Sequence, residues 1–90
     1  MKPYKEVLNN NSRVREFKIN TPNKELVWHR DEKDRHVTIL EGEGWHFQLD
    51  NELPLELQKK DVIFIPKQTY HRVLKGKTNL VIKIEEKWAE

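Results

Sequence analysis

Four histidines are the residues of this chain best suited to chemistry, because imidazole binds metal ions and exchanges protons near neutral pH. They are His29, His36, His46 and His71. His29 and Asp31 lie two positions apart, so in a strand both side chains point to the same face. A lone histidine in a small domain is usually structural or exposed, so the placement of the four decides whether they form a site.

The segment 45–49 alternates between apolar and polar residues, which is the pattern of a half-buried strand. Two arrangements of this strand are open. In one, His46 and Gln48 face the interior and join His29 and His71 around a polar pocket. In the other, the three apolar residues of the segment fill the core, and His46 and Gln48 face solvent. We therefore take His46 and Gln48 as candidate ligand-binding residues.

Short segments rich in β-branched, aromatic and leucine residues follow one another along the chain, separated by Gly, Pro, Asn and Asp. No amphipathic helix of useful length interrupts them. The pattern predicts an all-β sandwich or barrel, mainly antiparallel. The expected strands are residues 13–19, 25–31, 35–41, 45–49, 53–57, 62–65, 70–74 and 80–84.

The length of 90 residues is that of one domain. We expect a single domain over 1–90, with an N-terminal arm at 1–12, a core at 13–84 and a C-terminal tail at 85–90. A chain of this size buries only a thin core, and association with a second copy would enlarge it. We therefore expect a homodimer.

The charges exclude some classes of partner. The chain has 17 basic and 15 acidic residues, a net charge of +2, and the two signs are interspersed rather than gathered in a basic stripe. This distribution argues against nucleic-acid binding. The chain has neither a membrane-spanning apolar run nor the apolar stretch of a signal peptide at its start, so we expect no membrane partner. The absence of cysteine fits a cytoplasmic protein.

The stretch from His29 to Lys75 resembles a cupin domain. The first cupin motif runs His-x-His, three or four residues, Glu, six residues, Gly. At that spacing the chain has His29, Asp31, Arg35 and Gly42. The second motif runs Gly, five residues, Pro-x-Gly, two residues, His, three residues, Asn. At that spacing the chain has Lys60, Pro66, Gln68, His71 and Lys75.

This resemblance covers residues 24–84 and implies a double-stranded β-helix, or jelly-roll barrel. Metal-binding cupins use the two motif-one histidines, the motif-one glutamate and the motif-two histidine. Only His29 and His71 match, while Asp31 replaces the second histidine and Arg35 the glutamate. In the jelly roll, Asp31 shares the inner face with His29 and meets His71 from the facing strand. Two imidazoles and one carboxylate form a facial triad for a divalent metal such as Fe, Mn, Ni or Zn.

Arg35 leaves three arrangements open, because a cation beside a divalent metal is costly unless a charge partner compensates it. In the first, Arg35 pairs with Asp31 and the pocket is metal-free. In the second, Arg35 leaves the pocket to meet Glu32 or Glu41, and the triad holds a metal. In the third, Arg35 anchors an anionic small molecule.

Two functions follow from the resemblance. One is a small cupin that binds a divalent metal, a small polar ligand or both in its pocket, with metal-dependent activity on a small molecule. The other is a non-catalytic, metal-free cupin module that acts as a dimeric binding, sensor or accessory protein. Whether the chain is an enzyme stays open, and so does the identity of its small-molecule ligand.

Overall fold

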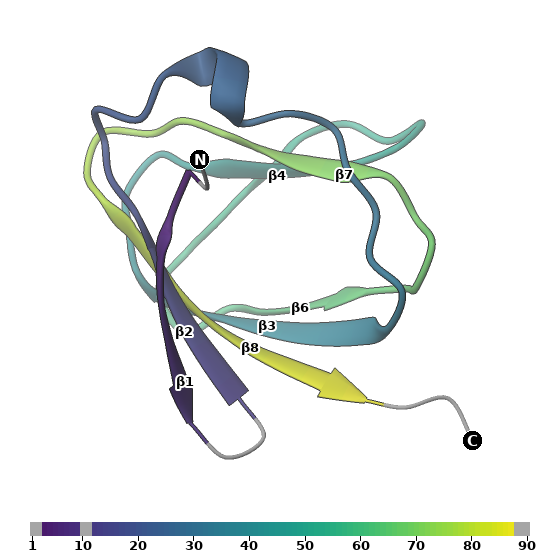
Figure 1. Ribbon diagram of the computed structural model, residues 1–90. Helices are drawn as coiled ribbons and strands as arrows, with labels where there is room; N and C mark the ends of the chain where they lie inside the picture. The colour runs from purple at the N-terminus through teal and green to yellow at the C-terminus, as the bar shows by residue number, and fades with distance from the viewer. Residues whose placement is uncertain (1–2, 10–11, 88–90) are drawn as a thin grey trace.

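Two antiparallel sheets face each other in the computed structural model, which describes residues 3–9 and 12–87 (Figure 1). The larger sheet has the strand order β1-β2-β8-β3-β6 and the smaller one β5-β4-β7. Every strand pair is antiparallel, as the sequence predicts. The strands are β1 (Lys5–Asn9), β2 (Ser12–Phe17), β3 (Asp34–Glu41), β4 (His46–Leu49), β5 (Leu55–Glu56), β6 (Val62–Ile65), β7 (His71–Leu74) and β8 (Leu80–Lys87).

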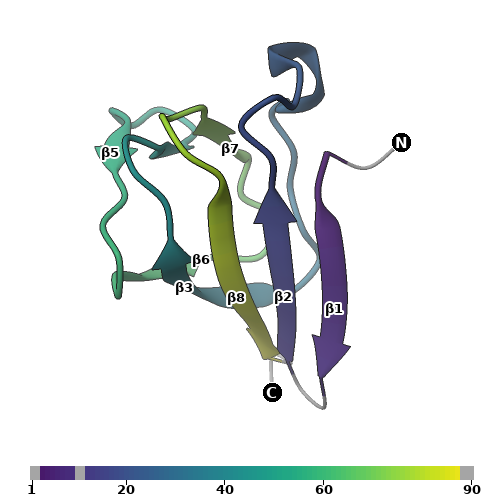
Figure 2. The ribbon, with the colours of Figure 1, turned by 90° about the vertical axis from the view of Figure 1, so that its left-hand side faces the viewer.

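The larger sheet is strongly curved, with β3 and β6 lying beneath the smaller sheet and β8, β2 and β1 rising beside it (Figure 2). No strand of one sheet pairs with a strand of the other within the described residues. The fold is therefore a jelly roll of two separate sheets that wrap around a common interior.

Alternation along the central strands builds the core. Every second residue is buried from Arg35 to Ile39 in β3 and from Leu80 to Ile84 in β8, and Val37 pairs with Ile84 across the two strands. These inner faces pack against Phe47 of the smaller sheet and against Trp45, which immediately precedes β4. Fully burying one such side chain contributes about 1.5–3 kcal/mol. The core thus holds the two sheets together and fixes which residues face inward.

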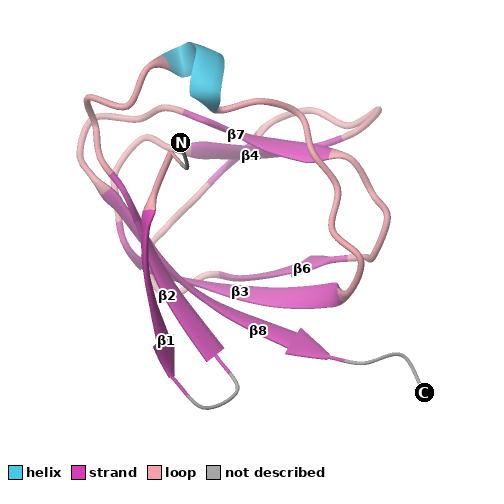
Figure 3. Cartoon of the chain, viewed as in Figure 1, coloured by secondary structure: helices cyan, strands magenta, loops and turns pink. Residues whose placement is uncertain are grey.

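The segment 25–31 is not the strand that the sequence predicts. A short 3-10 helix, η1 (Asn23–Glu25), follows Pro22, and the chain then crosses from the smaller sheet to the larger one (Figure 3). A crossing segment cannot stay beside one strand, so it forms only an isolated bridge, between His29 and His71. η1 is too short to cross a membrane, and the described residues contain no longer helix.

Three described residues other than glycine adopt a left-handed backbone: Asn51, Lys60 and Gln68. The last two belong to the segment that resembles the second cupin motif. Lys60 has a φ of 78° and Gln68 a φ of 60°. Both stand where the second cupin motif has glycine, the residue that adopts this conformation without steric strain. The backbone N–H of Gln68 donates to the carbonyl of Asp31, so this turn also positions the polar end of the interior.

We expect Lys60→Gly and Gln68→Gly each to stabilise the fold by about 0.5–1 kcal/mol, because glycine removes the strain at positive φ. Chemical denaturation followed by circular dichroism measures the change. Lys59→Gly is the control, since Lys59 is an exposed neighbour outside the positive-φ positions. It should lower stability. A loss of stability in all three variants would show that strain is not significant at these turns.

Candidate metal centre

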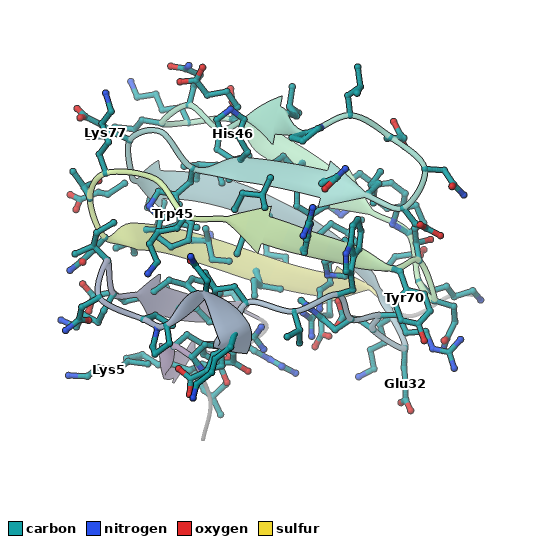
Figure 4. All side chains as sticks on the ribbon, turned by 90° about the horizontal axis from the view of Figure 1, so that it is seen from above. Lys5, Glu32, Trp45, His46, Tyr70 and Lys77 are labelled. Atoms are coloured by element: carbon teal, nitrogen blue, oxygen red, sulfur yellow. The ribbon has the colours of Figure 1, made fainter. Side chains whose placement is uncertain are left out.

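A cavity of about 340 Å³ lies between the two sheets. Most of its wall is apolar, and four polar residues of the predicted site line it together: His29, Asp31, Arg35 and His71. Figure 4 labels two residues that are chain neighbours of Asp31 and His71. Glu32 and Tyr70 lie at the end of the molecule opposite Trp45 and Lys77.

The backbone brings the two histidines side by side. The N–H of His29 donates to the carbonyl of His71 at 3.0 Å, and the N–H of His71 donates back at 2.8 Å. Their rings lie 4.3 Å apart between centroids and are inclined at 64°. Residues 42 positions apart in the sequence are therefore fixed next to each other by main-chain bonds.

Hydrogen bonds at Nδ1 orient both imidazoles. The Nδ1 atom of His29 lies 3.0 Å from the carbonyl oxygen of Val27, and that of His71 lies 2.8 Å from the carbonyl oxygen of Thr69. A carbonyl only accepts, so each Nδ1 carries a hydrogen and donates it. In the neutral ring, the lone pair then resides on Nε2. Metal-binding histidines are commonly held in this way by a carbonyl behind the ring.

Asp31 completes a triad of ligand atoms. Its Oδ2 atom is buried and lies 3.2 Å from His71 Nε2, yet it receives no well-aligned hydrogen bond in the described part of the chain. The ligand atoms of His29, Asp31 and His71 all lie within 4.8 Å of one another. A lone pair on Nε2 and a carboxylate oxygen repel each other at this distance unless a proton or a cation lies close to both. This donor set fits a divalent metal.

The pKa directions favour the ligand forms of two of these groups. Burial lowers the pKa of His29, although its bond to Val27 acts the other way. Burial would raise the pKa of Asp31, but a proton on Nε2 of His71 and the Arg35 guanidinium outweigh it and hold that pKa below its usual value. At neutral pH, His29 is therefore neutral and Asp31 ionised, as metal binding requires.

Arg35 forms the ion pair with Asp31 that the first of the three arrangements has, and it lines the cavity instead of leaving it as in the second. Its Nη1 atom lies 3.2 Å from Asp31 Oδ2, and its Nε donates to Glu86 Oε2 at 3.0 Å. The second acidic partner is Glu86, not Glu32 or Glu41. Arg13 also donates to Glu86, at 2.6 Å. Arg35 thus stays at the cavity, shared between the candidate metal ligand and a second carboxylate.

Glu86 is a site residue that the sequence analysis missed, because residues 85–90 were assigned to a tail. β8 continues to Lys87, and Glu86 lies opposite Arg35 in the register. The alternation of residues along β8 could have indicated that Glu86 faces the interior. Leu80, Ile82 and Ile84 are buried, and two further residues bring Glu86 to the same face.

His46 and Gln48 do not line the cavity. Phe47, between them on β4, lines it instead, so its neighbours point to the outer face. His46 donates through Nδ1 to the carbonyl of Gly44 at 3.1 Å, and Gln48 donates to the carbonyl of Glu52 at 2.9 Å. Of the two arrangements predicted for this strand, the structure has the one in which the apolar residues fill the core.

Solved structures with a similar arrangement of strands identify the fold of this chain. The chain superposes on a structure of DMSP lyases with a TM-score of 0.75 and 17% identity, over 87% of its own length. It superposes on a cupin-like protein from Thermotoga maritima with a TM-score of 0.68 and 20% identity, covering 96% of this chain and 74% of that one. The chain has the cupin fold.

Other comparisons limit what this likeness shows. An RmlC-like cupin from Methanocaldococcus jannaschii with a double-stranded β-helix fold gives a TM-score of 0.68 at 11% identity, covering 96% of this chain and 80% of that one. The chain spans 38% of the length of the DMSP lyase structure. No model of a protein family matches the sequence, and no curated protein matches it either. The cupin likeness therefore defines the fold, and the site has to be interpreted from its own residues.

Proposed function

We propose that this cupin-fold protein binds a divalent metal ion through His29, Asp31 and His71 and holds a small molecule in the cavity beside it. The observation that carries the proposal is the orientation of the three donors. Both histidines are held at Nδ1 by carbonyls, and a buried carboxylate oxygen without a well-aligned hydrogen bond lies beside Nε2 of His71. Iron, manganese, nickel and zinc all accept such ligands.

The charges around the site support this proposal. Arg13 and Arg35 carry two positive charges, and Asp31 and Glu86 carry two negative ones, so the network is neutral before a metal binds. Glu86 holds the Nε edge of Arg35, which limits how fully this cation can neutralise Asp31. A bound metal would supply Lewis-acid polarisation of a ligand oxygen.

The roles of the chain's own residues follow from their positions. His29 lies at the exposed side of the site, His71 is 4% exposed, and the apolar wall behind them excludes water. Arg35 would orient an anionic group of the bound molecule. Some proteins of this fold, the DMSP lyases, act on a small molecule, which supports a small-molecule ligand here. A homodimer and a cytoplasmic location stay predictions.

The ion pair between Arg35 and Asp31 favours a second candidate function. If Arg35 neutralises Asp31 fully, the cavity holds no metal, and the protein is a binding, sensor or accessory module. The two candidates differ in a measurable property, the affinity of the cavity for a divalent ion.

Titration with Zn²⁺ tests the proposal. His29→Ala should lower the affinity by more than about 100-fold, because loss of a direct ligand exceeds the effect of losing a residue behind a ligand. His46→Ala is the matched control, since His46 also donates through Nδ1 to a carbonyl but lies outside the cavity. It should leave the affinity unchanged. Equal effects of the two substitutions would contradict the proposed site.

A further inference from the structure

We infer that the molecule held beside the metal is a small monocarboxylate with an apolar body, an inference that rests on the proposed function. Three features of the cavity lead to it: the chemistry of its wall, the charge at its polar end and its size. The sequence alone led us to expect a polar ligand, and the wall of the cavity favours a different one.

Apolar side chains from both sheets line most of the cavity. Phe47 and Val73 come from the smaller sheet, and Ile63, Ile65 and Phe17 come from the larger one. A purely polar ligand would lose its hydrogen bonds to water on entering such a space, whereas an apolar body gains free energy there. The wall therefore selects a ligand whose bulk is hydrocarbon.

The charged residues on the wall locate the polar head of this ligand. Arg15 also lines the cavity, but its Nε atom already pairs with Glu6 and its guanidinium lies 4.1 Å from the centre of the Tyr4 ring. Glu25, the remaining charged residue of the wall, would repel an anion. The anionic head therefore belongs at the end with Arg35.

The positive charge at that end would attract an anionic head group, and the mainly apolar remainder of the wall disfavours a second carboxylate. The network of Arg13, Arg35, Asp31 and Glu86 is neutral, so a divalent ion leaves it with two positive charges. A carboxylate offsets one of these charges and accepts hydrogen bonds from a guanidinium in a planar, two-pronged geometry. It also occupies positions that a three-residue ligand set leaves open on the metal.

The volume limits the length of the apolar body. A cavity of roughly 150 Å³ lined by apolar side chains holds a benzene molecule. The cavity of about 340 Å³ in this protein is about twice as large. By that comparison it has room for roughly 13 non-hydrogen atoms. The metal ion and its remaining coordination sphere would occupy part of this space, so the ten non-hydrogen atoms of an eight-carbon carboxylate fit.

Calorimetric titration of the Zn²⁺-loaded protein with straight-chain carboxylates from acetate to decanoate tests the inference. The affinity should rise by about fourfold for each added methylene, as for transfer of a CH₂ group out of water. It should level off once the chain fills the cavity, near octanoate. The metal-free protein should bind every member of the series more weakly, because the positive charge beside Arg35 is then absent.

Two substitutions to phenylalanine test whether the dependence of affinity on chain length arises inside the cavity. Val73→Phe adds bulk to the wall and should remove the gain in affinity from long chains. Val62→Phe, on the outer face of β6 at a residue that is 63% exposed, should leave that gain unchanged. If Val73→Phe does not fold, the wild-type series still decides the inference.

The outcomes separate this inference from the proposed function. Binding of Zn²⁺ with an affinity for carboxylates that is the same at every chain length overturns the inference and leaves the metal site standing. No binding of Zn²⁺ overturns the proposed function, and the inference with it. A steady rise in affinity with chain length that Val73→Phe abolishes supports both.

Discussion

Replacing Arg35 by glutamine raises the affinity of the cavity for a divalent metal and lowers the stability of the metal-free protein. The guanidinium lies 3.2 Å from Asp31 Oδ2, and both side chains are almost fully buried, so little water screens the pair. Between the dielectric constant of water and that near a protein surface, two unit charges about 4 Å apart interact by roughly 1–4 kcal/mol. We therefore expect an affinity for Zn²⁺ that is about 10-fold to 1000-fold higher.

The free energy of unfolding of the metal-free protein should fall, because Arg35→Gln removes one partner from a buried ion-pair network. Loss of one buried partner costs about 3–5 kcal/mol when nothing replaces it. Arg13 still pairs with Glu86, which keeps the expected loss towards the lower end of that range. Zn²⁺ titration and urea unfolding of the metal-free variant measure the two effects.

Glu86→Gln should have the opposite effect on metal affinity. Without the Glu86 carboxylate, Arg35 has only Asp31 as an acidic partner among its described contacts, and it competes more strongly with the metal. Affinity should therefore fall, and the double variant with Arg35→Gln should restore it. Equal affinities in both single variants and the wild type would show that Arg35 does not control the site.

Trp45→Ala should lower the free energy of unfolding by about 3–5 kcal/mol, the usual effect of removing a buried tryptophan. The side chain of Trp45 is 0% exposed, and its ring lies 6.2 Å from that of Phe17. Its indole N–H donates to the carbonyl of Thr78 at 2.6 Å, which loses this partner in the variant. A domain of this size has a total stability of roughly 5–15 kcal/mol, so the variant comes close to unfolding.

Trp28→Ala is the matched control for this experiment. Trp28 is 39% exposed and contacts the guanidinium of Arg72, 4.6 Å from the ring centre. An exposed cation–π contact contributes about 0.5–1 kcal/mol, so the expected loss is within that range. Urea denaturation followed by circular dichroism compares the two variants. Similar losses at both positions would contradict the assignment of Trp45 to the centre of the core.

Local sequence patterns were sufficient to predict the all-β fold, because they record which side of a strand is buried. The alternation in β4 and the apolar runs of β6 and β8 correspond to observed strands. The segment 25–31 did not follow its β propensity, because it has to cross between two sheets. The N-terminal arm expected over 1–12 contains the strand β1, which pairs with β2. Pairing between segments that are distant in the sequence decides whether these two segments form strands, and local β propensity does not predict that pairing.

The candidate site was predictable only in part, for a similar reason. Motif spacing brought His29, Asp31 and His71 together as a hypothesis, and the structure places their ligand atoms within 4.8 Å of one another. The second acidic partner of Arg35 could not be found near it in the sequence, since Glu86 lies 51 residues away on a neighbouring strand. The hydrogen bonds that orient the two imidazoles also depend on backbone carbonyls, which carry no sequence signal.

The metal content of the purified protein tests the central claim most directly. Untagged protein prepared without a chelator would be analysed for iron, manganese, nickel and zinc, beside His71→Ala prepared in the same way. We predict close to one equivalent of a divalent metal in the wild-type protein and its loss in the variant. Metal-free wild-type protein that also takes up none of these ions on incubation would contradict the metal centre and leave the Arg35–Asp31 ion pair as the resting state of the cavity.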